Sequence, residues 1–202
     1  LAVAVWCCAP AAAALLPEPI AAIPEAVEAA IRSGETPGAV VLVVQDGEIV
    51  LRRAFGHRRL GPHPAPMTPD TVFDLASLTK VLATTSVAMQ AVARDALALD
   101  LPAVRLLPEL EGPERARITV EHLLEHTSGL PAWRPYFREL PAADLARPTG
   151  RDALRACCAA EPLSAPPGAR AEYSDLGFIL LGWLLERALG LPFADAVHSL
   201  VS

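Results

Sequence analysis

The sequence predicts a mixed α/β (α+β) domain in which one helix and a β-hairpin precede a mostly helical region. Apolar residues recur at helical spacing over residues 18–33, and two β-branched runs follow at 39–44 and 48–55. Later segments have helical patterns that are broken by prolines. The 202 residues are 52% hydrophobic and 20% charged, which is enough for a buried core and too apolar for extended disorder.

The first helix and the hairpin have clear local signals. Residues 18–33 end at Ser33-Gly34 and place these residues on one face, as expected of a helix that covers a sheet: Ile20, Ile23, Val27, Ala30 and Ile31. The two β-branched runs are joined by Gln45-Asp46-Gly47, and Asp-Gly between such runs favours a tight primed turn. We therefore expect an antiparallel pair of strands.

The remaining elements follow in order along the chain. A loop rich in Pro, Gly and His is expected at 56–69, a strand-like segment at 71–75, a long helix from Ser77 to Asp95, and shorter helices at 118–126, 150–160 and 175–190, the last ending at Gly190. Residues 193–202 show no terminating element. Since a two-stranded sheet is marginal alone, we expect an internal fragment whose later strands lie beyond Ser202.

The first 16 residues contain no charge and predict the remnant of a signal peptide, with residues 17–202 as the partial domain. This predicts an exported protein, periplasmic or extracellular, of a bacterium. The run is interrupted by Pro10 and is short for a membrane span. Either Cys7 or Cys8 is a candidate for a lipid anchor, although the expected role of the segment is an ordinary export signal.

Charge and cysteine content exclude several function classes. Seventeen basic against 23 acidic residues give a net charge of −6, so nucleic acid is not expected as a partner. The four cysteines form two adjacent pairs that match no zinc or redox spacing. We expect packing roles for Cys157 and Cys158, and no metal or organic cofactor.

The chemical signal centres on Lys80, which is the only lysine in the chain and lies one helical turn after Ser77. An amine at this spacing can activate the serine hydroxyl, and the amides at the helix start can stabilise an oxyanion. Only about one lysine amine in 2,500 is neutral at pH 7, so a base role requires a pKa near 7, at a cost of about 4.6 kcal/mol. Desolvation is expected from the apolar neighbours Phe73, Leu75, Val81 and Leu82. The alternative is a serine helix cap followed by an exposed lysine.

A second constellation, Tyr173-Ser174-Asp175, follows a Pro-Gly turn and precedes an apolar helix. With Ser77 and Lys80, it makes the chain resemble the serine β-lactamase and penicillin-binding protein superfamily, closest to class C β-lactamases, D-alanyl-D-alanine carboxypeptidases and related esterases. The resemblance spans residues 34–202 and rests on PGAVVLVVQDGEIVLRRAFG, TVFDLASLTKVLATTSVAMQ, LALDLPAVRLLPEL, ITVEHLLEHTSGLP and PPGARAEYSDLGFILLGWLLE, in the family's order.

The resemblance implies a β-lactamase/transpeptidase-like fold and a serine hydrolase acting through a covalent acyl-serine. Ser77 would be the nucleophile, with its own amide as half of an oxyanion hole, Lys80 its proton partner and Tyr173 a second proton shuttle. The substrate, a small molecule or peptide, would be a β-lactam, a D-Ala-D-Ala peptide or a carboxylic ester. Tyr173 has a simpler alternative as a half-buried aromatic with its hydroxyl in solvent.

Asp175 departs from the family pattern, which usually has a substrate-binding Asn at this position. An ionised carboxylate only accepts hydrogen bonds, and beside Lys80 it would favour the ammonium form. Four explanations remain: a protonated Asp175, a larger base role for Tyr173, altered activity, or codon drift in a chain without Asn. A purely structural alternative is that Asp175 caps the helix that begins near it.

The family also completes its site with a Lys- or His-containing triad ending in Gly on a late strand. No such triad occurs here, so we expect it beyond Ser202 and expect this stretch to be inactive by itself.

Two other function classes compete with the serine hydrolase. His122, Glu125 and His126 match a zinc-peptidase pattern, although the resemblance gives the HTSGL segment a turn-forming role. A catalytically silent homologue that binds cell-wall peptide is the third hypothesis.

Overall fold

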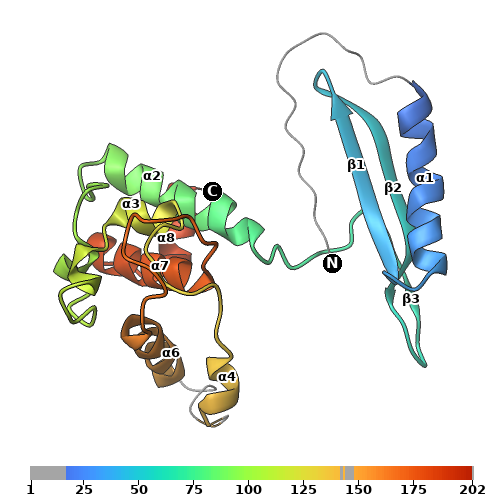
Figure 1. Cartoon of the computed structure of the whole chain (residues 1–202). Coiled ribbons are helices and arrows are strands. Elements are labelled where there is room, and N and C mark those ends of the chain that lie inside the picture. Colours follow the sequence, from blue (N-terminus) through green and yellow to red (C-terminus); the bar gives the residue numbers. More distant parts are fainter. Residues whose placement is uncertain (1–16, 142, 144–147, 202) are drawn as a thin grey trace. The chain divides into compact units, whose positions relative to one another are not determined.

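The computed structural model describes residues 17–141, 143 and 148–201. The chain divides into two compact units, Leu1–Asp74 and Leu75–Ser202 (Figure 1). The expected signal segment, residues 1–16 with both candidate anchor cysteines, lies outside the described residues.

The first unit contains one helix and a small antiparallel sheet. Its elements are α1 (Pro17–Arg32), β1 (Gly38–Gln45), β2 (Glu48–Arg59) and β3 (Ala65–Pro66), with strand order β1-β2-β3. Helix α1 contacts β2, where Phe55 is buried (Figure 1). The predicted helix lying over a hairpin is confirmed.

The hairpin turn has the predicted primed geometry. Asp46 and Gly47 both have positive φ, 52° and 84°, as a type I′ turn requires. The expected loop at 56–69 is only partly a loop, because β2 continues to Arg59 and pairs with β3. Gly56 of β2 lies close to the start of β1. Its φ is 64°, and a Cβ there would lie 2.4 Å from the carbonyl oxygen of Pro37, the residue before β1.

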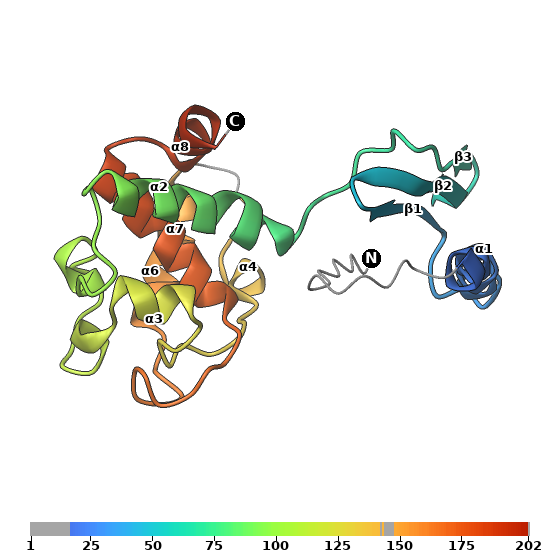
Figure 2. The same ribbon diagram turned by 90° about the horizontal axis from the view of Figure 1, so that it is seen from above.

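The named elements of the second unit, in its described part, are all helices joined by loops. Its elements are η1, a π-helical stretch (Lys80–Thr85), α2 (Ser86–Ala93), η2 (Ala103–Arg105), η3 (Arg115–Arg117), α3 (Val120–Leu124), α4 (Tyr136–Glu139), α6 (Pro148–Ala160), α7 (Asp175–Leu189) and α8 (Phe193–Leu200). Helix α7 contacts α2, α3, α6 and α8 and lies at the centre of the unit in both views (Figures 1 and 2).

Helix α7 is central because its sequence is apolar on all sides. It contributes these fully buried side chains: Leu176, Leu180, Leu181, Leu184 and Leu185. Burying one such side chain contributes about 1.5–3 kcal/mol. The helix ends at Gly190, which has a left-handed φ of 66°, as predicted. Cys158 is fully buried and Cys157 packs beside it in this core, so the packing prediction is confirmed, and burial raises the pKa of Cys158 to about 12.

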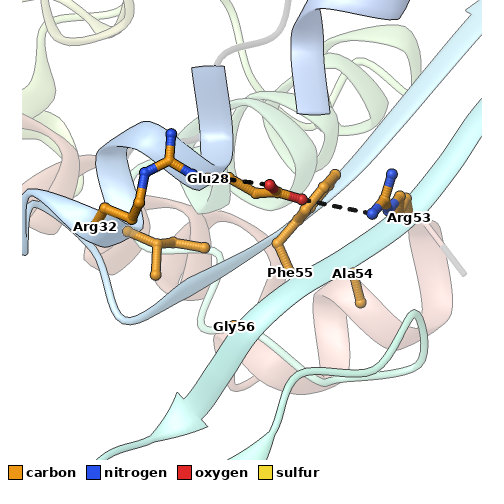
Figure 3. Close-up of a pocket in the computed structure, with 7 residues that line it drawn as sticks. Glu28, Arg32, Arg53, Ala54, Phe55 and Gly56 are labelled. Atoms are coloured by element: carbon orange, nitrogen blue, oxygen red, sulfur yellow. Dashed lines mark ion pairs between the residues drawn. The ribbon is translucent and has the colours of Figure 1, made fainter. Parts of the chain in front are cut away.

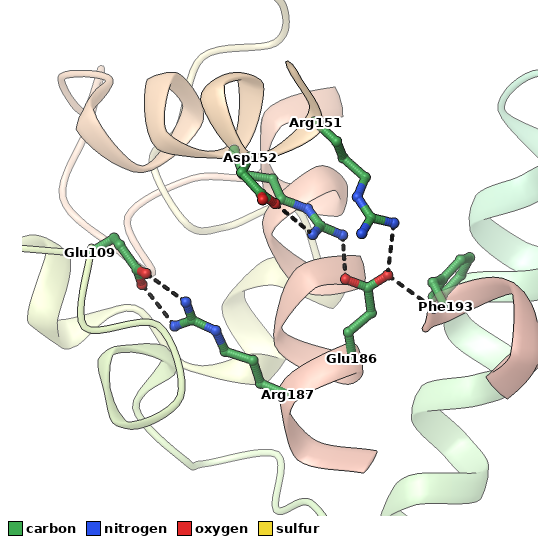
Figure 4. A network of polar contacts seen from close by, with 7 residues as sticks. Glu109, Arg151, Asp152, Glu186, Arg187 and Phe193 are labelled. Atoms are coloured by element: carbon green, nitrogen blue, oxygen red, sulfur yellow. Dashed lines mark hydrogen bonds and ion pairs between the residues drawn. The ribbon is translucent and has the colours of Figure 1, made fainter. Parts of the chain in front are cut away.

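The C-terminal end of α7 is held by a polar network (Figure 4). Glu186 accepts from Arg155 at 2.5 Å, from Arg151 at 3.4 Å and from the backbone N–H of Phe193 at 2.9 Å. Arg187 forms a bidentate pair with Glu109 at 2.6 and 2.8 Å. The network ties α7 to α6, to α8 and to the segment before α3.

Three of the predicted elements differ in the structure, and α8 was not predicted. Residues 71–75 belong to no strand, the helix predicted from Ser77 is π-helical over its first part, and the helix predicted at 118–126 is only α3. Residues 193–200, expected to lack an element, form α8. Among the described residues no single helix is both long and apolar enough for a membrane span, although α7 and α8, bent by 73°, reach those limits together.

Candidate active site

Ser77 lies in a tight turn that opens the helical segment of η1 and α2. The amides of Leu78, Thr79 and Lys80 donate to the carbonyls three residues earlier, at 2.9, 3.1 and 3.0 Å. These bonds place Lys80 one turn after Ser77, as predicted. They also engage the amides of Leu78, Thr79 and Lys80, so for these three the expectation of a free donor to an oxyanion is wrong, whereas the Ser77 amide is not part of these bonds.

Ala76, directly before Ser77, has a positive φ of 44°. Non-glycine residues rarely adopt this conformation, which costs of order 1–3 kcal/mol and clusters at functional sites. Sequence reasoning missed it, because no glycine or asparagine marks the position. The turn fixes the backbone from which the Ser77 side chain projects.

The structure brings the four predicted site residues together. Ser77 Oγ lies 2.6 Å from Tyr173 Oη and 3.3 Å from Lys80 Nζ, and Lys80 Nζ donates to Asp175 Oδ1 at 2.6 Å. The Lys80 side chain is only 15% exposed, so the exposed-lysine alternative is wrong. Tyr173 is half exposed, as its simpler alternative expected, and its hydroxyl is hydrogen-bonded to Ser77. The catalytic roles stay predictions.

The environment of Lys80 differs from the expected one. Its ammonium lies 4.9 Å from the centroid of the Tyr173 ring and 5.7 Å from that of Phe178. Burial alone would lower the pKa of Lys80, but hydrogen bonds to Asp175 and Tyr173, with the charge of Asp175, outweigh burial and raise it above 10.5. The pKa near 7 that a base role for Lys80 requires is therefore not reached, which agrees with the effect expected of an ionised Asp175. The expected apolar shell is wrong, because these neighbours are about half exposed: Leu75, Val81 and Leu82.

Asp175 is the first residue of α7 and does not cap it. The cap is Ser174, whose hydroxyl accepts the amide of Gly177 at 3.1 Å and donates to the Pro131 carbonyl at 2.8 Å. The capping alternative for Asp175 is therefore wrong. Its carboxylate lies near the positive end of the helix dipole and accepts a hydrogen bond from Lys80.

His126 also belongs to this cluster, although the sequence suggested only a turn or a metal ligand. Its Nδ1 accepts the backbone N–H of Ser174 at 3.0 Å, and its ring centroid lies 4.7 Å from that of Tyr173 and 4.8 Å from that of Phe178. The bond joins residues 48 positions apart. The signal in the sequence was the HTSG turn, which is present.

The geometry required by the zinc alternative is absent. Helix α3 ends at Leu124, and His126 has a positive φ of 59°, so His122 and His126 do not face one metal from one helix. His122 Nδ1 accepts the backbone N–H of Thr119 at 3.2 Å. Among the described residues no group of three or more metal-binding side chains occurs. We assign none of these residues as a metal ligand.

An open hollow of about 350 Å³ lies in the first unit, between α1 and β2 (Figure 3). Glu28 crosses it and pairs with Arg53 at 3.5 Å and with Arg32 at 3.9 Å. Its lining contains none of the four predicted site residues. Since its charges are paired with one another, we assign no chemistry to it.

The α/β fold and the contact of serine with lysine and tyrosine together define the class of β-lactamase-like and penicillin-binding proteins. The chain belongs to the Beta-lactamase family, whose model matches residues 23–201. The resemblance and the predicted fold are thereby confirmed.

Curated and solved relatives agree with this assignment. The chain is 40% identical over 186 residues to esterase EstB of Burkholderia gladioli, covering 86% of this chain and 46% of the relative. A class C β-lactamase from Rhodobacter sphaeroides superposes with a TM-score of 0.69 at 29% identity, covering 89% and 47%. EstCE1, described as a hydrolase with promiscuous acyltransferase activity, has a TM-score of 0.71 at 27% identity, covering 89% and 49%. The chain thus spans about half the length of relatives that it matches.

Proposed function

We propose that this chain carries the nucleophile and proton-transfer groups of a serine hydrolase that cleaves carboxylic esters by acyl transfer through Ser77. The observation that carries the proposal is the placement of Ser77 Oγ within 2.6 Å of Tyr173 Oη and 3.3 Å of Lys80 Nζ. A serine is a weak nucleophile until a neighbouring group takes its proton, and these two side chains hydrogen-bond its hydroxyl oxygen.

Tyr173 is the proton carrier in this proposal, because Lys80 is held as an ammonium ion by Asp175. As Ser77 Oγ bonds the substrate carbonyl carbon, its proton passes to the Tyr173 oxygen, and the Tyr173 proton passes to the departing alcohol. The bond between carbonyl carbon and alcohol oxygen breaks, and an acyl-Ser77 ester remains. Lys80 donates to Ser77 Oγ and stabilises the developing negative charge, and the Ser77 amide is the proposed donor to the carbonyl oxygen.

The second half-reaction uses the same groups in reverse. Water attacks the acyl carbon while its proton passes to Tyr173, and the proton held by Tyr173 returns to Ser77 Oγ. The free carboxylic acid leaves and the starting site is restored. Neither step requires Lys80 to lose its proton, which agrees with its raised pKa.

An ester fits this site better than an amide. An alkoxide is a better leaving group than an amide anion, so cleavage of an ester depends less on complete protonation of the departing group by Tyr173. The name of the 40% identical relative, an esterase, supports the same choice. The β-lactam and the D-Ala-D-Ala peptide are therefore the comparison substrates.

The test is covalent labelling of the full-length protein with a fluorophosphonate probe. We expect one adduct, located at Ser77 by peptide mass spectrometry, and its loss in Ser77→Ala. Ser86→Ala is the matched control, since Ser86 lies further along the same helical segment and its hydroxyl donates to the Val81 carbonyl at 3.2 Å. Labelling that survives Ser77→Ala would refute the nucleophile.

Turnover separates the substrate classes. We expect hydrolysis of a nitrophenyl ester by the wild-type protein, with slower cleavage of a chromogenic cephalosporin and of a D-Ala-D-Ala peptide. Faster cleavage of either comparison substrate would overturn the preference for esters while leaving the Ser77 mechanism intact. Saturable binding of cell-wall peptide with no adduct would instead establish the silent homologue.

A further inference from the structure

His126 contacts the Tyr173 segment from three directions. Its backbone carbonyl accepts the amide of Glu172 at 2.8 Å, its Nδ1 accepts the amide of Ser174 at 3.0 Å, and its ring stacks on Tyr173 with an interplanar angle of 36°. The residues on both sides of Tyr173 are therefore bonded to one histidine. This arrangement restricts both the backbone and the ring of Tyr173.

The backbone of His126 is itself held firmly. The amide of Thr127 donates to the His122 carbonyl at 2.8 Å, and the amide of Gly168 donates to the Thr127 carbonyl at 2.8 Å. His126 has a φ of 59°, a left-handed conformation that histidine adopts more readily than most residues. The end of α3 thus provides a fixed support for the imidazole.

The contact with Ser174 defines the protonation state of the ring. A nitrogen that accepts an N–H carries no proton, so the imidazole is neutral with its hydrogen on Nε2. The charged groups that act on it are Lys80 from η1 and Asp175 from α7. Burial first, and the positive charge of Lys80 second, lower the pKa of His126, while Asp175 opposes them.

We propose that neutral His126 is a positioning residue that holds Tyr173 Oη against Ser77 Oγ, and that protonation of its imidazole releases Tyr173. The protonated ring cannot accept the Ser174 amide, and it places a second positive charge near Lys80. Activity is then present above the pKa of His126 and is lost as the pH falls through it. The inference rests on the proposed function, because it assigns a control to Tyr173.

The kinetic test uses two replacements that separate the contacts. His126→Asn keeps an acceptor for Ser174 and tolerates a positive φ, but does not titrate. His126→Phe keeps an aromatic ring and loses the acceptor. His122→Asn is the matched control, because His122 Nδ1 also accepts a backbone N–H, from Thr119, away from Tyr173.

We expect the acid limb of kcat for ester hydrolysis to disappear in His126→Asn and to persist in His122→Asn. In His126→Phe, kcat should fall about ten- to a hundredfold with little change in KM, as expected when a reacting group is misplaced. An acid limb that is unchanged in His126→Asn, or a kcat that is unchanged in a folded His126→Phe, would overturn the proposal.

A spectroscopic arm tests the inference without catalysis. In the isotopically labelled wild-type protein, the Ser174 amide resonance should shift with the same midpoint as the His126 imidazole. A Ser174 amide chemical shift that does not change as His126 titrates would overturn the positioning role even if the enzyme is active. If Ser77 labelling fails but the Ser174 resonance follows His126, the proposed function is wrong and the contact that holds Tyr173 still stands.

Discussion

The two ends of α7 each carry a carboxylate paired with a cation, but in different surroundings. At the N-terminal end, Asp175 pairs with Lys80, and their side chains are 37% and 15% exposed. At the C-terminal end, Glu186 pairs with Arg155, and their side chains are 11% and 9% exposed. One pair is open on one side and the other is enclosed.

The difference shows that an ion pair of a carboxylate with a cation can have two different roles in one helix. Glu186 accepts hydrogen bonds from three donors. It lies near the C-terminal end of the helix, where the dipole disfavours a carboxylate, so the positive charges of Arg151 and Arg155 offset that unfavourable interaction. Lys80 gives one bond to Asp175 and another to Ser77 Oγ. The C-terminal network therefore stabilises the fold, whereas the N-terminal pair contacts Ser77, the proposed nucleophile.

The largest effect should come from Tyr173→Phe, which removes the proposed proton carrier at the N-terminal end and keeps the ring on His126. We expect the rate of Ser77 acylation to fall by about 10²–10⁴-fold, the usual contribution of general acid–base catalysis, with no measurable loss of stability. Stopped-flow acylation by a nitrophenyl ester measures the rate.

The control for Tyr173→Phe is Tyr136→Phe, which changes the other tyrosine of the chain. Burial first, and its hydrogen bond to Glu161 second, raise the pKa of Tyr136, so its hydroxyl is a structural donor. This variant should lose stability and keep its acylation rate per folded molecule. Equal rates in Tyr173→Phe and the wild type would remove Tyr173 from the mechanism.

At the C-terminal end, Glu186→Gln should show the opposite pattern. Removing the carboxylate leaves the enclosed guanidinium of Arg155 with the largely exposed Asp152, at 3.4 Å, as its remaining carboxylate partner among the described residues, which costs about 3 kcal/mol in the free energy of unfolding. Urea unfolding measures the loss, and Ser77 labelling of the folded fraction should be unchanged. Arg151→Ala is the control: that side chain is 62% exposed, so its loss should cost about 0–1 kcal/mol. Similar losses in both variants would contradict the enclosed character of the Arg155 pair.

Local signals in the sequence were sufficient for most of the fold. Asp46-Gly47 specifies its own turn, and Gly190 ends α7, because each depends on backbone preferences of one or two residues. Strand β3 and the short α4 carried no comparable signal, since a two-residue strand and a four-residue helix exist only through their packing. Family motifs, rather than periodicity, identified the fold class.

The four residues of the site were predicted, and the stabilisation of the Lys80 ammonium by Asp175 was one of the alternatives that the sequence left open. Ser77, Lys80, Tyr173 and Asp175 meet as expected, but the pKa of Lys80 moves in the opposite direction from the one that a base role needs. Neighbours in sequence suggested desolvation, whereas the dominant partner, Asp175, is 95 positions away. His126 was missed for the same reason, because its bond to Ser174 spans 48 positions.

Asp175→Asn tests this electrostatic result and should have the smallest effect on stability. The pair is partly exposed, so its loss should change the free energy of unfolding by about 0–1 kcal/mol. The pKa of Lys80 should fall, because burial, which lowers it, then acts without an opposing carboxylate. The stability that this pair contributes is fully present below pH 10.5, the ordinary lysine pKa, and is lost as the pH rises through the raised value, so Asp175→Asn should flatten the alkaline decline.

The same variant decides between the two roles of Lys80. If the ammonium is the working form, the alkaline limb of ester hydrolysis moves to lower pH in Asp175→Asn, and activity near pH 7 does not increase. If the neutral amine is the base, removing the carboxylate raises the fraction of that form and increases activity near pH 7. Asp152→Asn is the matched control, because Asp152 also bonds a cation, Arg155, but lies in α6. A rise in activity confined to Asp175→Asn would therefore return the base role to Lys80 and leave Tyr173 as its partner.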